Sequence, residues 1–108
     1  MPMVDAQIQL AEYIAADLPE VSRNEWMRWM QMASYCGMDR AIRHAEQLST
    51  DITMRPAIQR ANRLIAKAMR AQLGALQQLS PDQRKTLFGY VSWWLRIRTL
   101  RGSLRFEE

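Results

Sequence analysis

Four cations recur at helical spacing between residues 56 and 79, and these side chains have the clearest potential for chemistry. They are Arg60, Arg63, Lys67 and Arg70. On a helix they fall within an arc of about 80°. No carboxylate interrupts the segment, although solvated helix faces usually mix both signs because like charges at this spacing repel. Such a row suits a phosphate backbone. Four phosphate contacts predict a salt slope of about −3.6 on duplex DNA or about −2.8 on a single strand. The alternative is a solvated face without a partner.

A second group of cations lies near the C-terminus. Its members are Lys85, Arg96 and Arg98, and we expect them to make weaker backbone contacts. Trp93 or Tyr90, which lie close to these arginines in the sequence, could stack on a base. The simpler interpretation is that cations at the end of a helix favour its dipole and reach water past the tryptophans.

Large apolar residues crowd the segment from residue 26 to residue 32. Five of them fall within seven positions, so they cannot all face one side of a helix. Exposed Trp and Met residues adapt well to protein partners, although such residues more often belong to a core. The expected partner interface comprises Trp26, Trp29 and Met30, with Trp93 from the C-terminal segment.

Residue types that support catalysis or metal binding are scarce. His44 is the only histidine and Cys36 the only cysteine, so the chain has no set of metal ligands. The sequence contains no catalytic triad pattern and no glycine-rich phosphate loop. We therefore expect no metal, no cofactor and no enzymatic activity.

The elements that hold these residues are predicted to be helices of a single domain spanning 1–108. Apolar residues make up 48% of the sequence, helix formers dominate, and β-branched residues do not cluster. The apolar spacing and the caps predict a compact all-α bundle of about five helices, over 4–17, 22–36, 39–49, 56–79 and 80–101. We expect the long fourth and fifth helices to form an antiparallel hairpin.

Charge is divided unevenly along the chain. Residues 1–51 contain four Arg and eight Asp or Glu, a net charge of −4, whereas residues 52–108 contain eleven Lys or Arg and three carboxylates, a net charge of +8. This asymmetry indicates nucleic acid, an anionic membrane surface or head-to-tail contact with another copy.

The N-terminus lacks the pattern of a secretion signal, and no apolar run is long enough to cross a bilayer. With a single cysteine, these features predict a cytoplasmic protein. A membrane-surface helix over 87–101 is the weakest alternative, because its polar strip is narrow.

The segment from Leu79 to Arg98 resembles the closing helix of the helical small subunits of multi-subunit CRISPR effector complexes. The matching residues are Leu79, Ser80, Asp82, Gln83, Phe88, Gly89 and Tyr90, and the segment covers about twenty of the 108 positions. The sequence departs from the family pattern at Trp93 and Trp94. The resemblance implies a small α-bundle that stacks along a complex and lines a path for nucleic acid.

These observations lead to two functional expectations. The first is a non-catalytic, sequence-independent nucleic-acid-backbone-binding subunit of a larger nucleoprotein complex, which the resemblance would make RNA-guided. The second is a helical protein–protein interaction adaptor that docks a partner through its Trp and Met surfaces. The expected partners are RNA or DNA, together with other protein subunits or further copies of the chain. No membrane partner is expected.

Overall fold

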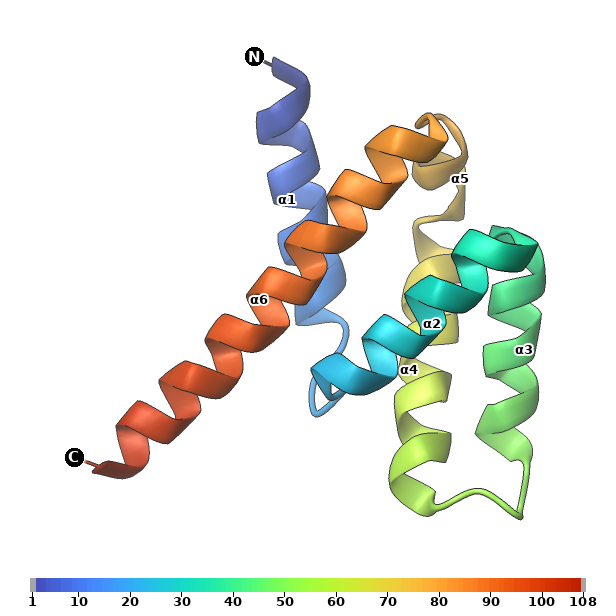
Figure 1. The fold of residues 1–108 in the computed structure, drawn as a ribbon, viewed down its shortest axis with the longest axis vertical. Coiled ribbons are helices and arrows are strands. Elements are labelled where there is room, and N and C mark those ends of the chain that lie inside the picture. Colours follow the sequence, from blue (N-terminus) through green and yellow to red (C-terminus); the bar gives the residue numbers. More distant parts are fainter. Residues whose placement is uncertain (1, 108) are drawn as a thin grey trace.

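The structure, a computed structural model, describes the backbone of residues 2–107 and the side chains of residues 6–98. Six helices account for most of this part of the chain (Figure 1). They are α1 (Pro2–Ala16), α2 (Arg23–Cys36), α3 (Met38–Thr50), α4 (Pro56–Ala71), α5 (Leu73–Gln77) and α6 (Pro81–Glu107).

The helices are arranged as two packed pairs with α2 between them. In Figure 1, α3 and α4 run side by side in opposite directions, and α6 crosses α1. Helix α2 touches α3, α4 and α6, so it joins the two pairs. The C-terminal turns of α6 extend away from the other helices (Figure 1).

An aromatic cluster holds α2 against α3 and α6. The ring centroids of Trp26 and Trp29 lie 5.3 Å apart in a stacked arrangement, and Phe88 meets both indoles edge-on, with 5.5 Å between centroids. Each indole N–H also donates to a backbone carbonyl, Trp26 to that of Phe88 and Trp29 to that of Ala41. Both N–H groups therefore remain hydrogen-bonded in the core, which avoids the cost of burying a free donor.

The predicted caps fix where two helices begin. The Ser22 hydroxyl accepts the backbone N–H of Glu25 at the start of α2. At the start of α6, the Ser80 hydroxyl accepts the backbone N–H of Gln83, and the Gln83 side chain accepts the backbone N–H of Ser80. This second arrangement is a complete capping box.

The all-α class is confirmed, but the predicted arrangement of five helices differs from the structure. The segment expected to form one helix over 56–79 divides at Gln72, whose φ of −105° and ψ of 8° lie outside the helical region. The bend turns the short α5 so that Leu76 is fully buried. The expected hairpin of the fourth and fifth predicted helices is not confirmed, because α4 packs along α3 and α6 along α1.

Candidate nucleic-acid interface

Helix α4 separates an apolar side from a basic side. Its buried residues include Ala61, Ile65, Ala68 and Met69, which face the core. The four predicted contact residues, Arg60, Arg63, Lys67 and Arg70, are all exposed. The structure therefore places the four cations on the solvent side of one helix, as their spacing predicted.

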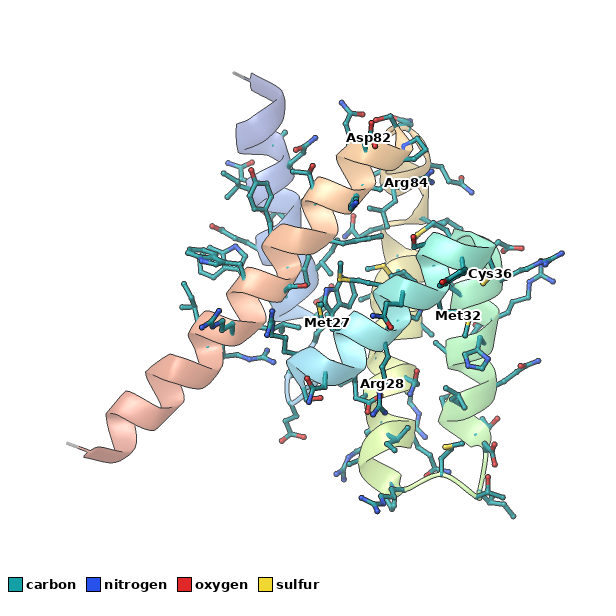
Figure 2. The ribbon with its side chains drawn as sticks, viewed as in Figure 1. Met27, Arg28, Met32, Cys36, Asp82 and Arg84 are labelled. Atoms are coloured by element: carbon teal, nitrogen blue, oxygen red, sulfur yellow. The ribbon has the colours of Figure 1, made fainter. Side chains whose placement is uncertain are left out.

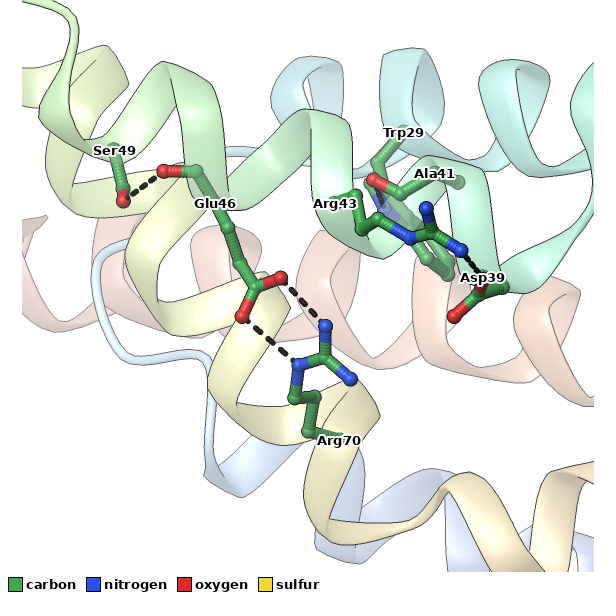
Figure 3. A network of polar contacts seen from close by, with 7 residues as sticks. All are labelled: Trp29, Asp39, Ala41, Arg43, Glu46, Ser49 and Arg70. Carbon is green, nitrogen blue, oxygen red and sulfur yellow. Dashed lines mark hydrogen bonds and ion pairs between the residues drawn. The ribbon is translucent and has the colours of Figure 1, made fainter.

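Arg70 is neutralised within the protein. Its guanidinium donates two hydrogen bonds to the Glu46 carboxylate of α3, from Nε to Oε2 at 2.9 Å and from Nη2 to Oε1 at 2.6 Å (Figure 3). These bonds lower the pKa of Glu46 and raise that of Arg70. The prediction of four uncompensated cations is therefore wrong at Arg70, because a carboxylate from the acidic half reaches it.

Arg63 also contacts α3, but no carboxylate of the described residues pairs with it. Its Nη2 donates to the backbone carbonyl of Ser49 at 3.4 Å, near the C-terminus of α3. A helix C-terminus carries partial negative charge, so this contact orients the guanidinium without supplying a counter-ion.

Arg60 and Lys67 complete the exposed basic surface. In the part of the chain that the structure describes, no carboxylate forms an ion pair with Arg60, Arg63 or Lys67. We call these three residues the open stripe. Consecutive members are three and four residues apart, so the stripe is about 10 Å long.

The N-terminal end of the open stripe borders a shallow pocket of about 220 Å³. Its lining residues are Pro19, Glu20, Ala57, Arg60, Ala61, Arg63 and Leu64, so the loop between α1 and α2 faces α4 here. Glu20 has a φ of 65°, a conformation that non-glycine residues rarely adopt. Its carboxylate is the negative group on the pocket wall, yet it forms no ion pair among the described residues.

Arg98 has a structural partner on the other side of the same loop. Its Nη1 donates to the carbonyl of Leu18 at 2.9 Å and to that of Ala15 at 3.5 Å, and its Nη2 donates to that of Val21 at 3.1 Å. These carbonyls lie at and just after the C-terminal end of α1. The guanidinium therefore joins the last turn of α1 and the loop that follows it to α6, although the side chain stays exposed.

Lys85 and Arg96, the remaining predicted cations, are exposed on α6. No ion pair involves either side chain in the described part of the protein. They belong to a different helix from the open stripe and form a separate basic surface.

The predicted partner interface is largely buried. Trp26 is 0% exposed and Trp29 3% exposed, so both belong to the core and the prediction that they form a surface is wrong. The reason is the aromatic cluster, which requires both indoles for packing against Phe88. Met30 is half-buried, whereas Trp93 is 53% exposed.

A larger pocket, which sequence reasoning missed, lies between α2 and the start of α6. It has a volume of about 500 Å³ and is lined by Met27, Met30, Gln31, Ala33, Ser34, Gly37, Met38, Pro81, Asp82, Arg84, Lys85 and Phe88. Met27 belongs to α2, and its sulfur accepts a hydrogen bond from the Ser92 hydroxyl of α6 at 3.5 Å; Arg84 lies on the first turns of α6 (Figure 2). Met27 and Met30, within the apolar segment 26–32, were a signal for this pocket, but Met38 and Arg84 line it only because the fold brings α3 and α6 to the same side of α2.

Comparison with known proteins finds no family model, no curated protein and no solved structure that matches this chain. Within the part of the chain that the structure describes, no helix combines the length and apolar character needed to span a membrane.

Proposed function

We propose that the protein is a non-catalytic subunit that binds the phosphate backbone of RNA or DNA through the open stripe, without reading base sequence. Arg60, Arg63 and Lys67 carry the contact. Arg70 contributes only where a phosphate takes the place of the Glu46 carboxylate. Arg98 does not contribute, because its guanidinium donates to the carbonyls of Leu18 and Val21.

One observation supports this proposal above the others. Three exposed cations stand in a row on a helix whose opposite side is buried, and no carboxylate of the described chain pairs with any of them. Proteins usually relieve such repulsion with acidic residues at neighbouring positions, as α3 does by pairing Arg43 with Asp39. A ligand with regularly spaced negative charges would relieve it instead.

We further propose that the protein acts as an accessory subunit of a larger nucleoprotein complex. The open stripe is short, and few phosphate contacts give weak binding at physiological salt. Other subunits that hold the same strand would raise the effective concentration of the ligand. The resemblance of residues 79–98 to CRISPR small subunits agrees with this role and would make the complex RNA-guided, but the proposal rests on the charge distribution.

The test is a charge reversal with a matched control. The variant Arg60→Glu, Arg63→Glu and Lys67→Glu should abolish binding to duplex DNA in a mobility-shift assay while its helical circular dichroism stays unchanged. The control variant reverses three exposed arginines elsewhere, Arg23, Arg28 and Arg40, and has the same net charge. Equal loss of binding in both variants would mean that net charge alone governs binding, and unchanged binding in the first would remove the proposal.

A second candidate function is a protein–protein adaptor, and the larger pocket is the observation that favours it. Methionines line its apolar part, and flexible methionine side chains suit the binding of apolar side chains from a partner. Arg84 and Lys85 at the pocket would favour an acidic amphipathic helix. The adaptor is the better account if the wild-type protein binds RNA and DNA only weakly and its affinity does not change with salt concentration.

A further inference from the structure

The exposed side of α6 carries a tryptophan between two cations. Trp93 is 53% exposed, and Lys85, Gly89 and Arg96 are exposed as well. At 100° per residue these four positions fall within an arc of about 80°, and Lys85 and Arg96 are about 16 Å apart along the axis. We call this surface the Trp93 strip. It lies apart from the buried side of α6, which includes Leu87, Val91 and Leu95.

Gly89 leaves open space on the same side of α6 as Trp93. Trp93 lies four residues after Gly89, one turn later on the same side of the helix. A Cβ atom at Gly89 would meet no atom within 4 Å. Packing against the described residues therefore does not require a glycine here, although glycine lowers the stability of a helix interior. The missing side chain keeps the helix surface one turn before Trp93 open to a ligand.

The ring of Trp94 packs against the exposed indole of Trp93. The ring centroids of Trp93 and Trp94 are 5.1 Å apart at an interplanar angle of 72°, an edge-to-face contact. Trp94 is itself partly buried and packs against the core. This contact holds the Trp93 ring in a defined orientation, which lowers the entropy cost of binding a ligand to it.

The charges of the strip favour an anionic ligand. Lys85 and Arg96 form no ion pair within the described chain, so both cations remain available. Among the side chains of α6 that the structure describes, the one carboxylate is that of Asp82, which lies beyond Lys85, about 16 Å along the axis from Trp93. A flat aromatic surface with a cation on each side matches a ligand that combines planar rings with phosphates.

We propose that the Trp93 strip binds single-stranded nucleic acid by stacking one unpaired base on the indole of Trp93, while Lys85 and Arg96 contact phosphates on either side. The inference rests on the proposed function and specifies its ligand as single-stranded. Bases in a duplex have their faces covered by neighbouring base pairs, so they cannot stack on this indole. Stacking of this kind tolerates any base, in agreement with binding that does not read sequence.

The experiment compares Trp93→Leu, Trp93→Phe and wild-type protein for binding to an oligo(dT) strand and to a duplex of the same length. Trp93→Leu should weaken binding to the single strand by about 5- to 150-fold, the loss expected for one stacked base. Trp93→Phe should retain most of the affinity, and duplex binding should stay unchanged in both. Tyr35→Leu, at an aromatic residue that is 92% exposed on α2, is the matched control and should bind as wild type.

A second variant tests the open space while keeping Trp93 and every charge. Gly89→Leu should stabilise α6 and yet weaken binding to oligo(dT), because its side chain covers the open helix surface one turn before Trp93. Wild-type affinity in both Trp93→Leu and Gly89→Leu would overturn the inference. If the two variants bind as wild type but charge reversal of the open stripe abolishes binding, the proposed function stands and only the inference about Trp93 is lost. If wild-type protein binds neither oligo(dT) nor duplex, both proposals fail.

Discussion

The guanidinium of Arg70 and the carboxylate of Glu46 form a two-point ion pair between α4 and α3, with N–O distances of 2.9 and 2.6 Å. The two residues are 24 positions apart in the sequence and come from the basic and acidic halves of the chain. Their contact shortens the row of available cations from four to three. Glu46 thus occupies the position that a phosphate would take at Arg70, and the pair can limit the affinity of α4 for a polyanion.

Replacement of Glu46 by Gln should strengthen nucleic-acid binding. The substitution keeps the size of the side chain and removes its charge, so Arg70 becomes available as a fourth phosphate contact. On duplex DNA, the plot of log K against log salt should become steeper by about 0.9. Asp39→Asn, which frees Arg43 on α3 instead, is the matched control and should leave the slope unchanged. The interpretation fails if both variants bind as wild type.

The same ion pair predicts how stability responds to acid. Arg70 lowers the pKa of Glu46 below its usual 4.5, so the pair stabilises the fold fully above that pH. This contribution is lost as the pH falls through the lower pKa of the folded state. Urea unfolding should therefore show a stability difference between wild type and Glu46→Gln at neutral pH that vanishes well below pH 4.5. A difference that stays constant in acid would contradict the assignment of the shift to Arg70.

Arg98 should matter for stability rather than for binding. Arg98→Met keeps a long side chain but leaves the carbonyls of Leu18 and Val21 without their charged donor. We expect a loss of about 1–3 kcal/mol in the free energy of unfolding, measured with urea. The salt slope for duplex DNA should stay at the wild-type value. A stable variant with a shallower slope would instead make Arg98 a phosphate contact.

Trp26 should behave as a core residue. It is 0% exposed, and its indole both packs on Trp29 and donates to the carbonyl of Phe88. Trp26→Ala should lower the free energy of unfolding by about 3–5 kcal/mol, a large part of the stability of a small domain. Tyr35→Ala, at a residue that is 92% exposed, should change it by less than about 0.5 kcal/mol. Equal effects would indicate that Trp26 is not packed as described.

Local patterns in the sequence predicted most of the helices, because their signals act over a few residues. The capping box at Ser80 and Gln83 marks the start of α6, and Gly37 ends α2 with a positive φ of 88°. The exposure of the basic side of α4 also followed from the spacing of its residues. In each case the relevant contact lies within about one turn of helix.

Contacts between distant segments were not predictable in the same way. Gln72 lies within the segment 56–79, which was predicted as one helix, but only the packing of Leu76 into the core explains why the chain bends there. The pairing of Arg70 with Glu46 and the contact of Arg98 with the loop after α1 depend on which helices become neighbours. Periodicity identifies the side of a helix that is buried but not the helix that covers it.

The most direct test of the central claim is the salt dependence of binding in a neutral variant of the open stripe. We would compare wild type with Arg60→Gln, Arg63→Gln and Lys67→Gln combined, on duplex DNA, where stacking on Trp93 does not contribute. Three lost phosphate contacts should make the slope of log K against log salt shallower by about 2.7. Identical slopes for the two proteins would contradict the account, because the open stripe would then contact no phosphate.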